Sequence, residues 1–569
     1  MCILLNKSLR TMRSAGGAIV RLLSRLRKTP IALFFARRGP AIAASLVVAS
    51  FIITRLAFLL HFRLADVAID YWSYFDVFQQ ARHGQWPRLT LRTPGYPLFL
   101  AVALSISRSA MSIVIAQCVT TLIAALGALA CFVRVDRRLA YPAAIALVGF
   151  ISSMHSVVFD TTLMSESLYC SLLMLSLGTL TLAILRGGAL ACAGASFAMA
   201  GCVLTRPAGI FLFGVYGLTL GWLLLRRRPR RHVFAFLLPL PIIFLALCTY
   251  NRLVIGAFTV TPFGDFAILG VVATYIEEDP TAPAEVNAAV RNIRDSVTPE
   301  DRAVAFTSRD PDELYRVFTK YNEPAIYTHM AKVKIEYMQL TRIHKQLTWL
   351  AIRRHPELYL KFVAVNFYKV NQNAFLFPDL YDYLRIRYDR QYLQRDLAAN
   401  LPESERRDLL LEYWDPVPQP HIRRVGMQTI VDAPWSRRMH ERFNEVHVAI
   451  FSSVIWLFGA ILLFPVVIWK LIRSRARDAG AILVFVHLSA LAGAGIVVGL
   501  TGMGMTRYGA TALFLSYLTP LHLCLLAWRR VGTGTETATS GSAYETQPFS
   551  PTPLPAINVS AEVDPAIQT

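Results

Sequence analysis

Two carboxylates and a tyrosine recur at helical spacing just after the first long apolar run of the chain. Asp66, Asp70 and Tyr74 lie at positions i, i+4 and i+8, so a helix over this segment would place all three on one face. A carboxylate within hydrogen-bond reach of a hydroxyl group can act as a general base. The alternative is that these acids only mark the boundary between an apolar run and water.

A third acid opens another apolar run. Glu166 begins the run 166–185, and His155 and Asp160 lie shortly before it. An ionisable group at the start of such a run is costly to bury and is usually functional or paired. The alternative is that Ser165 caps a helix whose positive end interacts with Glu166. The sequence leaves both interpretations open.

Two arginines occupy similar places in short links beside apolar runs. Arg206 lies in Thr205-Arg206-Pro207, and Arg507 lies in Thr506-Arg507-Tyr508. The planar guanidinium is a permanently charged fork of donors that suits phosphate, so these residues together with Tyr508 predict a phosphate site. The alternative is that each arginine only reaches from an apolar run toward water.

The composition favours a polytopic membrane protein. Of 569 residues 54% are hydrophobic and 17% charged, and several uncharged apolar runs reach the roughly 20 residues that span a bilayer as helix. A cytosolic enzyme, a collagen and a disulfide-stapled secreted domain are excluded. The segment 251–447 holds 26 Lys and Arg against 26 Asp and Glu, so the net charge of +21 comes from the N-terminal tail and from short basic clusters. This distribution is typical of inner loops of membrane proteins and disfavours nucleic acid as a partner.

Run length and flanking charge predict an all-α polytopic membrane protein with ten transmembrane helices. They are expected near 41–62, 111–133, 139–158, 166–185, 188–204, 208–225, 233–250, 448–470, 479–500 and 510–528. The apolar segment Pro94–Ser107 is too short to span and is expected to be an interfacial or re-entrant helix. Within the long loop, 325–370 has the composition of one continuous helix.

The expected organisation follows the positions of the basic clusters, which are placed inside. A basic cytoplasmic segment (1–40) precedes a transmembrane catalytic core (41–250) that contains the first periplasmic loop (63–110). A large, mainly helical periplasmic cap (251–447), C-terminal transmembrane helices (448–528) and a disordered cytoplasmic tail (529–569) follow.

A series of short motifs resembles the ordered landmarks of GT-C glycosyltransferases, most closely the relatives of protein O-mannosyltransferases and lipid A aminoarabinose transferases. The resemblance runs from about 41 to 528, with the landmarks in order. They are Asp70 with Tyr74 and Gly84, Arg92-Thr93-Pro94-Gly95-Tyr96-Pro97-Leu98-Phe99-Leu100, Ser165-Glu166-Ser167-Leu168, Thr205-Arg206-Pro207, Tyr250-Asn251-Arg252 through Gly256-Ala257-Phe258, His355-Pro356-Glu357-Leu358-Tyr359 and Arg507-Tyr508.

The resemblance implies an enzyme of the bacterial inner membrane that takes a sugar from a polyprenyl-phosphate carrier and transfers it, with inversion, to an acceptor on the periplasmic side. The family's base maps onto Asp70, because the spacing to Tyr74 and Gly84 fits from there and not from Asp66. The acceptor is expected to be a cell-envelope glycan or lipid. A protein acceptor is disfavoured because the first loop lacks an adjacent Asp-Glu pair.

The remaining site residues follow from the same motifs and neighbourhoods. Tyr74, Arg92, Tyr96 and His155 are expected to bind substrate. Membrane lipids are expected as partners, the sequence indicates no definite cofactor, and the need for a divalent cation stays open. Two other classes of protein compete with this interpretation, a transporter or flippase of lipid-linked sugars and a non-catalytic membrane subunit.

Overall fold

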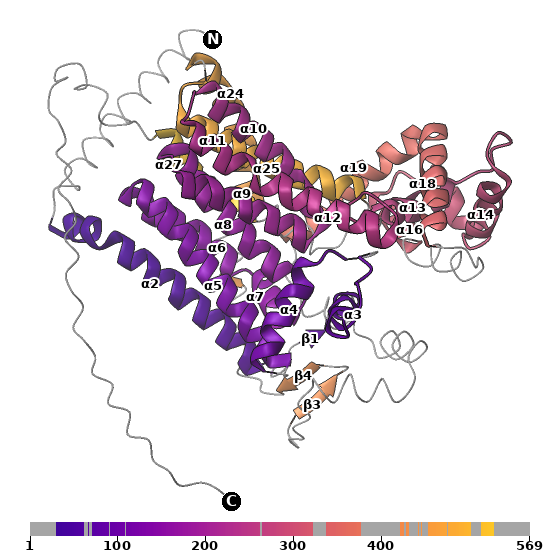
Figure 1. Ribbon diagram of the computed structural model, residues 1–569, viewed down its shortest axis with the longest axis horizontal. Helices are drawn as coiled ribbons and strands as arrows, with labels where there is room; N and C mark the ends of the chain where they lie inside the picture. Colours follow the sequence, from indigo (N-terminus) through magenta and orange to yellow (C-terminus); the bar gives the residue numbers. More distant parts are fainter. Residues whose placement is uncertain are drawn as a thin grey trace, which may run out of the picture. The chain divides into compact units, whose positions relative to one another are not determined.

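The structure is a computed structural model whose described part is mainly helical (Figure 1). The described residues are 30–61, 66–67, 71–89, 92–107, 110–261, 264–321, 337–376, 422–425, 428–431, 453–474, 476–501 and 514–527, with single positions between 438 and 446. The chain divides into two units, Met1–Ala527 and Trp528–Thr569, and every described residue belongs to the first.

Six described helical segments are long and apolar enough to cross a membrane. They are Arg38–Ala57, Met111–Val135, Glu166–Leu185, Pro207–Leu225, Arg230–Ile255 and Ala479–Val497. A bent pair of helices raises the number to seven if it forms one span. The prediction of a polytopic all-α chain is therefore supported in its coarse form, whereas fewer than the expected ten segments meet these criteria within the described residues.

The N-terminal half contains closely packed helices. Their bounds are α2 Pro30–His61, α5 Ala110–Val135, η1 Arg137–Leu139, α6 Ala140–Ile151, α7 Met154–Thr161, α8 Glu166–Leu185 and α9 Ala189–Thr205. In Figure 1, α8 lies beside α5 and α9. A Cβ added at Gly178 would lie 2.8 Å from Ala128 Cα, so small residues permit the close approach of α8 to α5.

The third expected span, 139–158, is not one straight helix. It consists of α6 and α7, which are bent by 63°. The side chain of Ser153 accepts a hydrogen bond from the backbone N–H of Ser156 and so caps the start of α7. This local capping explains why a new helix begins within the apolar run.

The expected first outer loop, 63–110, contains one short strand and two short helices, and its strand pairs with a strand between α7 and α8. β1 Asp66–Val67 pairs in parallel with β2 Thr162–Leu163, with Asp66 opposite Thr162. α3 spans Tyr71–Arg82, and α4 spans Gly95–Ile106, a short apolar helix as expected for Pro94–Ser107. Because Asp66 belongs to a strand and α3 begins only at Tyr71, the prediction that one helix carries Asp66, Asp70 and Tyr74 on one face is wrong.

The remaining elements include an outer helical cluster, which we define as α13 to α19. Those before it are η2 Pro207–Phe211, α10 Leu212–Leu225, α11 Arg230–Leu237 and α12 Pro239–Ile255. The cluster comprises α13 Gly264–Val272, η3 Ala273–Tyr275, α14 Ala284–Arg294, α15 Pro299–Thr307, α16 Pro311–Lys320, α18 Tyr337–Arg354 and α19 Pro356–Leu376. After it come β3 Ile422–Val425, β4 Gln428–Val431, α24 Ser453–Arg473, α25 Ala479–Thr501 and α27 Thr519–Ala527.

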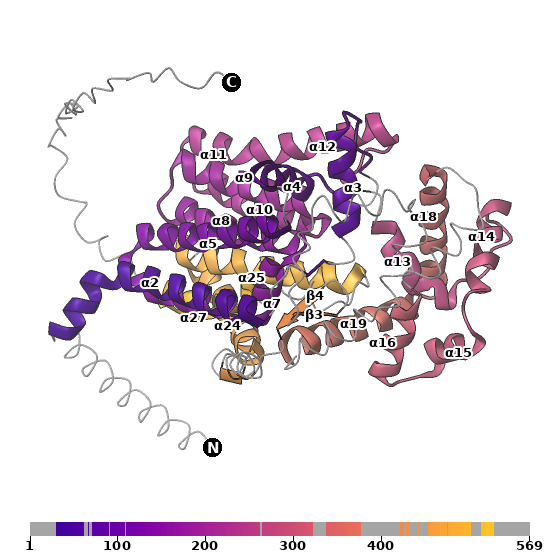
Figure 2. The same ribbon diagram turned by 90° about the horizontal axis from the view of Figure 1, so that it is seen from below.

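The outer helical cluster has a hydrophobic core of its own, to which Tyr275, Phe318 and Phe362 contribute large buried rings. In Figure 2, α13, α14 and α18 lie side by side. The continuous helix expected over 325–370 is interrupted, because α18 ends at Arg354 and α19 begins at Pro356. Proline has no backbone N–H and disfavours helical geometry in the preceding residue, so the break falls at His355.

Candidate active site

The end of α9 and the start of α8 bring two opposite charges together. Arg206 Nη1 lies 2.5 Å from Glu166 Oε1, and both side chains are buried. Pro207 favours extended backbone at Arg206, which ends α9 there and turns the arginine toward the site. Sequence reasoning treated Glu166 and Arg206 separately, and the structure joins them as one pair.

Ser165 links this pair to the first outer loop. Its hydroxyl oxygen accepts a hydrogen bond from Arg206 Nη1 at 3.0 Å and lies 2.9 Å from the Tyr74 hydroxyl. The same hydroxyl lies 3.4 Å from Glu166 Oε2. Ser165 occupies the N-cap position of α8, but its side chain makes no capping hydrogen bond, so that part of the alternative is wrong. Glu166 does lie in the first turn of α8, as the other part of the alternative expected.

The other aromatic and basic residues expected to bind substrate surround Tyr74. The Arg92 guanidinium lies 5.0 Å from the centre of the Tyr74 ring, and Arg92 Nε donates to Ser73 Oγ at 2.6 Å. The rings of Tyr74 and Tyr96 pack edge to face at 5.1 Å. Three of the four expected substrate-binding residues therefore meet beside the Arg206–Glu166 pair.

Tyr74 is held in its protonated form. Burial raises the pKa of its phenol, and the nearby charges of Arg92 and Arg206 only partly oppose this effect. A protonated phenol can donate a hydrogen bond but cannot accept a proton, so Tyr74 is suited to positioning rather than to base catalysis.

Gly95 explains how α4 reaches this region. A Cβ at Gly95 would lie 2.7 Å from the backbone carbonyl carbon of Leu204, closer than any side chain tolerates. The Pro94-Gly95-Tyr96 motif therefore packs directly against the residues that precede Arg206. From α4, the Tyr96 hydroxyl donates to Gln117 Oε1 at 2.7 Å.

Gln117 secures the segment that leads from α7 into α8. Its side-chain amide nitrogen lies 3.0 Å from the carbonyl oxygens of Phe159 and Asp160 and 2.8 Å from that of Thr162. One buried amide on α5 thus contacts three carbonyls around β2, the strand that pairs with β1. These contacts connect the first outer loop, β2 and α8 into one hydrogen-bonded assembly.

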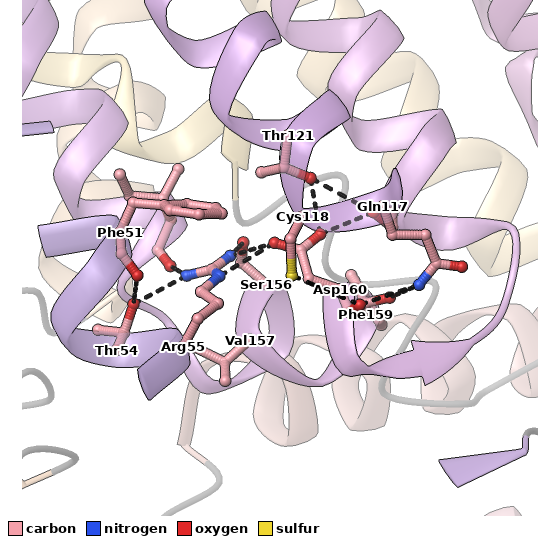
Figure 3. Close-up of polar contacts among 12 residues, drawn as sticks. Phe51, Thr54, Arg55, Gln117, Cys118, Thr121, Ser156, Val157, Phe159 and Asp160 are labelled. Atoms are coloured by element: carbon pink, nitrogen blue, oxygen red, sulfur yellow. Dashed lines mark hydrogen bonds and ion pairs between the residues drawn. The ribbon is translucent and has the colours of Figure 1, made fainter. Parts of the chain in front are cut away.

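Figure 3 shows a second buried ion pair, between Arg55 and Asp160. Arg55 donates from Nε to Asp160 Oδ2 at 3.0 Å, and its Nη2 lies 2.5 Å from the same oxygen. The other carboxylate oxygen accepts from Thr121 at 2.6 Å and from Ser167 at 2.7 Å. Because Ser167 follows Glu166 directly, two consecutive residues of α8 contact the two pairs.

Arg55 also stabilises the break between α6 and α7. Its Nη1 donates to the carbonyl oxygen of Ile151, the last residue of α6, and to Thr54 Oγ1. Its Nη2 donates to Ser156 Oγ at 2.7 Å. Carbonyls at a helix end lack partners within the helix, and here the arginine of α2 supplies one.

Sequence reasoning missed Arg55 and Gln117. Both lie inside apolar runs, where burying an arginine or an amide costs free energy unless the group has hydrogen-bond partners. A polar residue inside an apolar run was therefore the sequence signal that could have identified them. Of the residues that it did single out, His155 lies on α7 with its ring 6.4 Å from that of Phe159. Asp70, Arg507 and Tyr508 lie outside the described residues, although Val67 and Tyr71 on either side of Asp70 belong to β1 and α3.

Within the described part of the chain, no group of three or more His, Cys, Asp or Glu side chains is arranged to hold a metal ion. Comparisons with protein-family models, with curated proteins and with solved structures found no match to this chain.

Proposed function

We propose that this protein is an integral membrane glycosyltransferase that transfers a sugar from a polyprenyl-phosphate carrier to an extracytoplasmic acceptor with inversion. The observation that carries the proposal is the buried Arg206–Glu166 pair in contact with Tyr74 through Ser165. It joins three of the sequence landmarks of GT-C glycosyltransferases at one place. A bacterial inner membrane, with the site facing the periplasm, is the setting that these landmarks imply.

The proposed reaction needs a base for the acceptor. The acceptor hydroxyl oxygen attacks C1 of the sugar, and the carboxylate of Asp70 takes the proton of that hydroxyl. The bond between C1 and the phosphate oxygen breaks, and its electron pair leaves with the polyprenyl phosphate. Attack opposite the leaving group inverts the anomeric centre.

The leaving phosphate needs fixed positive charge. Arg206 and Arg507 are proposed to supply it, and a preorganised guanidinium in a site shielded from water stabilises developing negative charge strongly. Glu166, one of the catalytic candidates of the sequence, is proposed to position Arg206 through their ion pair. Arg92 is proposed to bind the sugar or acceptor, with the buried rings of Tyr74 and Tyr96 packed beside it.

Transfer can be tested with the purified full chain in lipid nanodiscs. The protein is incubated with a radiolabelled pool of polyprenyl-phosphate sugars and an extract of cell-envelope glycans and lipids. We expect label in the acceptor fraction and release of polyprenyl phosphate. In proteoliposomes, movement of the labelled donor between leaflets without transfer would instead assign the protein to the flippases, and neither activity would favour a non-catalytic subunit.

A further inference from the structure

Helix α19, the last helix of the outer helical cluster, packs along α25. The Tyr359 hydroxyl donates to the carbonyl oxygen of Leu500 at 2.8 Å, and a Cβ at Gly495 would lie 3.3 Å from Phe367. Residue numbers rise along α19 where they fall along α25, so the two helices are antiparallel. α25 contains one of the segments that are long and apolar enough to cross a membrane. The start of α19 therefore lies level with the end of α25, and the later turns of α19 lie alongside α25.

One face of α19 is already occupied by protein. Leu358, Phe362 and Val365 are buried in the core of the outer helical cluster. Lys361 Nζ donates to the carbonyl oxygen of Ala305 at 3.3 Å on α15. The three apolar residues attach the helix to the cluster on the side away from the exposed residues, whereas Lys361 lies at the edge of the exposed face and its ammonium is bonded to Ala305.

The exposed face of α19 is apolar. Leu360 is 65% exposed, Phe367 51% and Tyr368 54%, and Ala364 between them is also exposed. Positions i, i+4, i+7 and i+8 share one face of a helix. The exposed acid of this helix, Glu357, lies one turn earlier, before Tyr359 reaches the end of α25. The fully exposed charge of the helix thus precedes the level where α25 ends, and Lys361, which follows at the edge of the face, is half-buried and bonded to Ala305.

The neighbouring surface of α25 continues the same character. Ile496 is 58% exposed and Leu500 40% exposed. An apolar surface that is continuous with the outside of a membrane-spanning helix is expected to contact lipid. Tyrosine is common between lipid headgroups and acyl chains, which suits Tyr359 at the end of α25.

We propose that the α19 lipid face, which we define as Leu360, Ala364, Phe367 and Tyr368, contacts the acyl chains of the bilayer leaflet nearest the outer helical cluster. The cluster is then seated on the membrane by a helix that enters one leaflet. The face runs from 360 to 368, a little over two turns or about 12 Å along the helix. This assignment does not depend on the proposed enzymatic function.

A photoreactive side chain can test the contact directly. The photo-crosslinker p-benzoylphenylalanine replaces Leu360, Ala364 or Phe367 in the full chain, one position at a time. The protein is reconstituted into vesicles of phosphatidylethanolamine and phosphatidylglycerol, irradiated and weighed by intact mass spectrometry. Ile123, exposed on α5, is the positive control, and Ala284, exposed at the start of α14, is the matched control within the cluster.

We expect the mass of one phospholipid to be added at 360, 364 and 367 with a yield like that at 123, and no such addition at 284. Addition at 123 alone would overturn the proposal. Crosslinking of 360 or 367 to a second copy of the chain would also overturn it, because the face would then be a contact between proteins.

Discussion

The guanidinium of Arg206 and the carboxylate of Glu166 lie 2.5 Å apart although both side chains are shielded from solvent. Two buried charges of opposite sign stabilise one another only when both are present, and removal of one partner leaves the other uncompensated. A substitution that alters the charge or the length of either side chain is therefore expected to destabilise the pair.

Substitutions of Arg206 test its proposed contact with the carrier phosphate. Arg206→Lys keeps the charge but loses the bidentate fork, so we expect a partial loss of transfer, whereas Arg206→Ala should lower kcat by about 10²–10³-fold. Inhibition by polyprenyl phosphate is measured for each variant together with its melting temperature. If Arg206→Ala and Arg507→Ala were both inhibited like the wild type, the arginines would have a structural role only.

The Arg55–Asp160 pair is expected to contribute to stability. Asp160→Asn should lower the free energy of unfolding by roughly 3–5 kcal/mol, because it leaves the charge of Arg55 buried without its partner. The double variant Arg55→Met with Asp160→Asn should lose less than the sum of the two single variants.

A pair on the surface serves as the control for that experiment. Arg291 and Glu278 lie 2.6 Å apart but are 52% and 36% exposed, so Glu278→Gln should cost roughly 0–1 kcal/mol. Urea or thermal unfolding of the purified protein in detergent compares the two pairs. Equal losses of unfolding free energy for Asp160→Asn and Glu278→Gln would contradict a stabilising role of the Arg55–Asp160 pair.

The outer helical cluster should lose stability in acid through Asp301. Burial by itself raises the pKa of this carboxyl, but hydrogen bonds from Lys320, Tyr321 and Thr298 outweigh burial and hold the pKa below its ordinary value of 3.8. Because the unfolded chain takes up this proton more readily, the stabilisation is complete above about pH 4 and is lost as pH falls through the pKa of the folded state. The Asp301→Asn variant should be less stable at neutral pH and show a smaller loss between pH 5 and 3. Hydrogen exchange of α15 and α16 measures the stability at neutral pH and its loss in acid. A loss between pH 5 and 3 in the variant as large as in the wild type would contradict this account.

The proposed orientation can be tested with single cysteines at exposed positions. Glu300→Cys in the outer helical cluster should react with a membrane-impermeant maleimide in intact cells, and Arg230→Cys should react only after permeabilisation. The unsubstituted chain gives the background from the native cysteines. Labelling at 230 from outside would reverse the orientation.

The sequence predicted features that depend on neighbouring residues. Run length located α5 and α8 within a few residues, because the length needed to cross a bilayer is a local property. The same pattern located α9, which is an apolar helix shorter than the six candidate spans. Pro356 was also a local signal for the break before α19, and the prediction of one continuous helix overlooked it.

Features that depend on distant segments could not be predicted in this way. Arg55 and Asp160 are separated by 105 positions, and no periodicity connects them. The expected helix through Asp66 failed because pairing of β1 with β2 competes with the local helical spacing. The contact of Tyr74 with Ser165 likewise arises only when the first outer loop and α8 fold together.

The most direct test of the proposed function is transfer by Asp70→Asn, with Asp66→Asn as the matched control. The purified chains are compared in nanodiscs for release of polyprenyl phosphate from a labelled donor pool, and their melting temperatures are recorded. We predict that the wild type and Asp66→Asn transfer sugar, whereas Asp70→Asn is folded but inactive, because an amide keeps the shape of the carboxylate and cannot accept a proton. Turnover by Asp70→Asn equal to the wild type, or loss of activity in Asp66→Asn alone, would contradict the account.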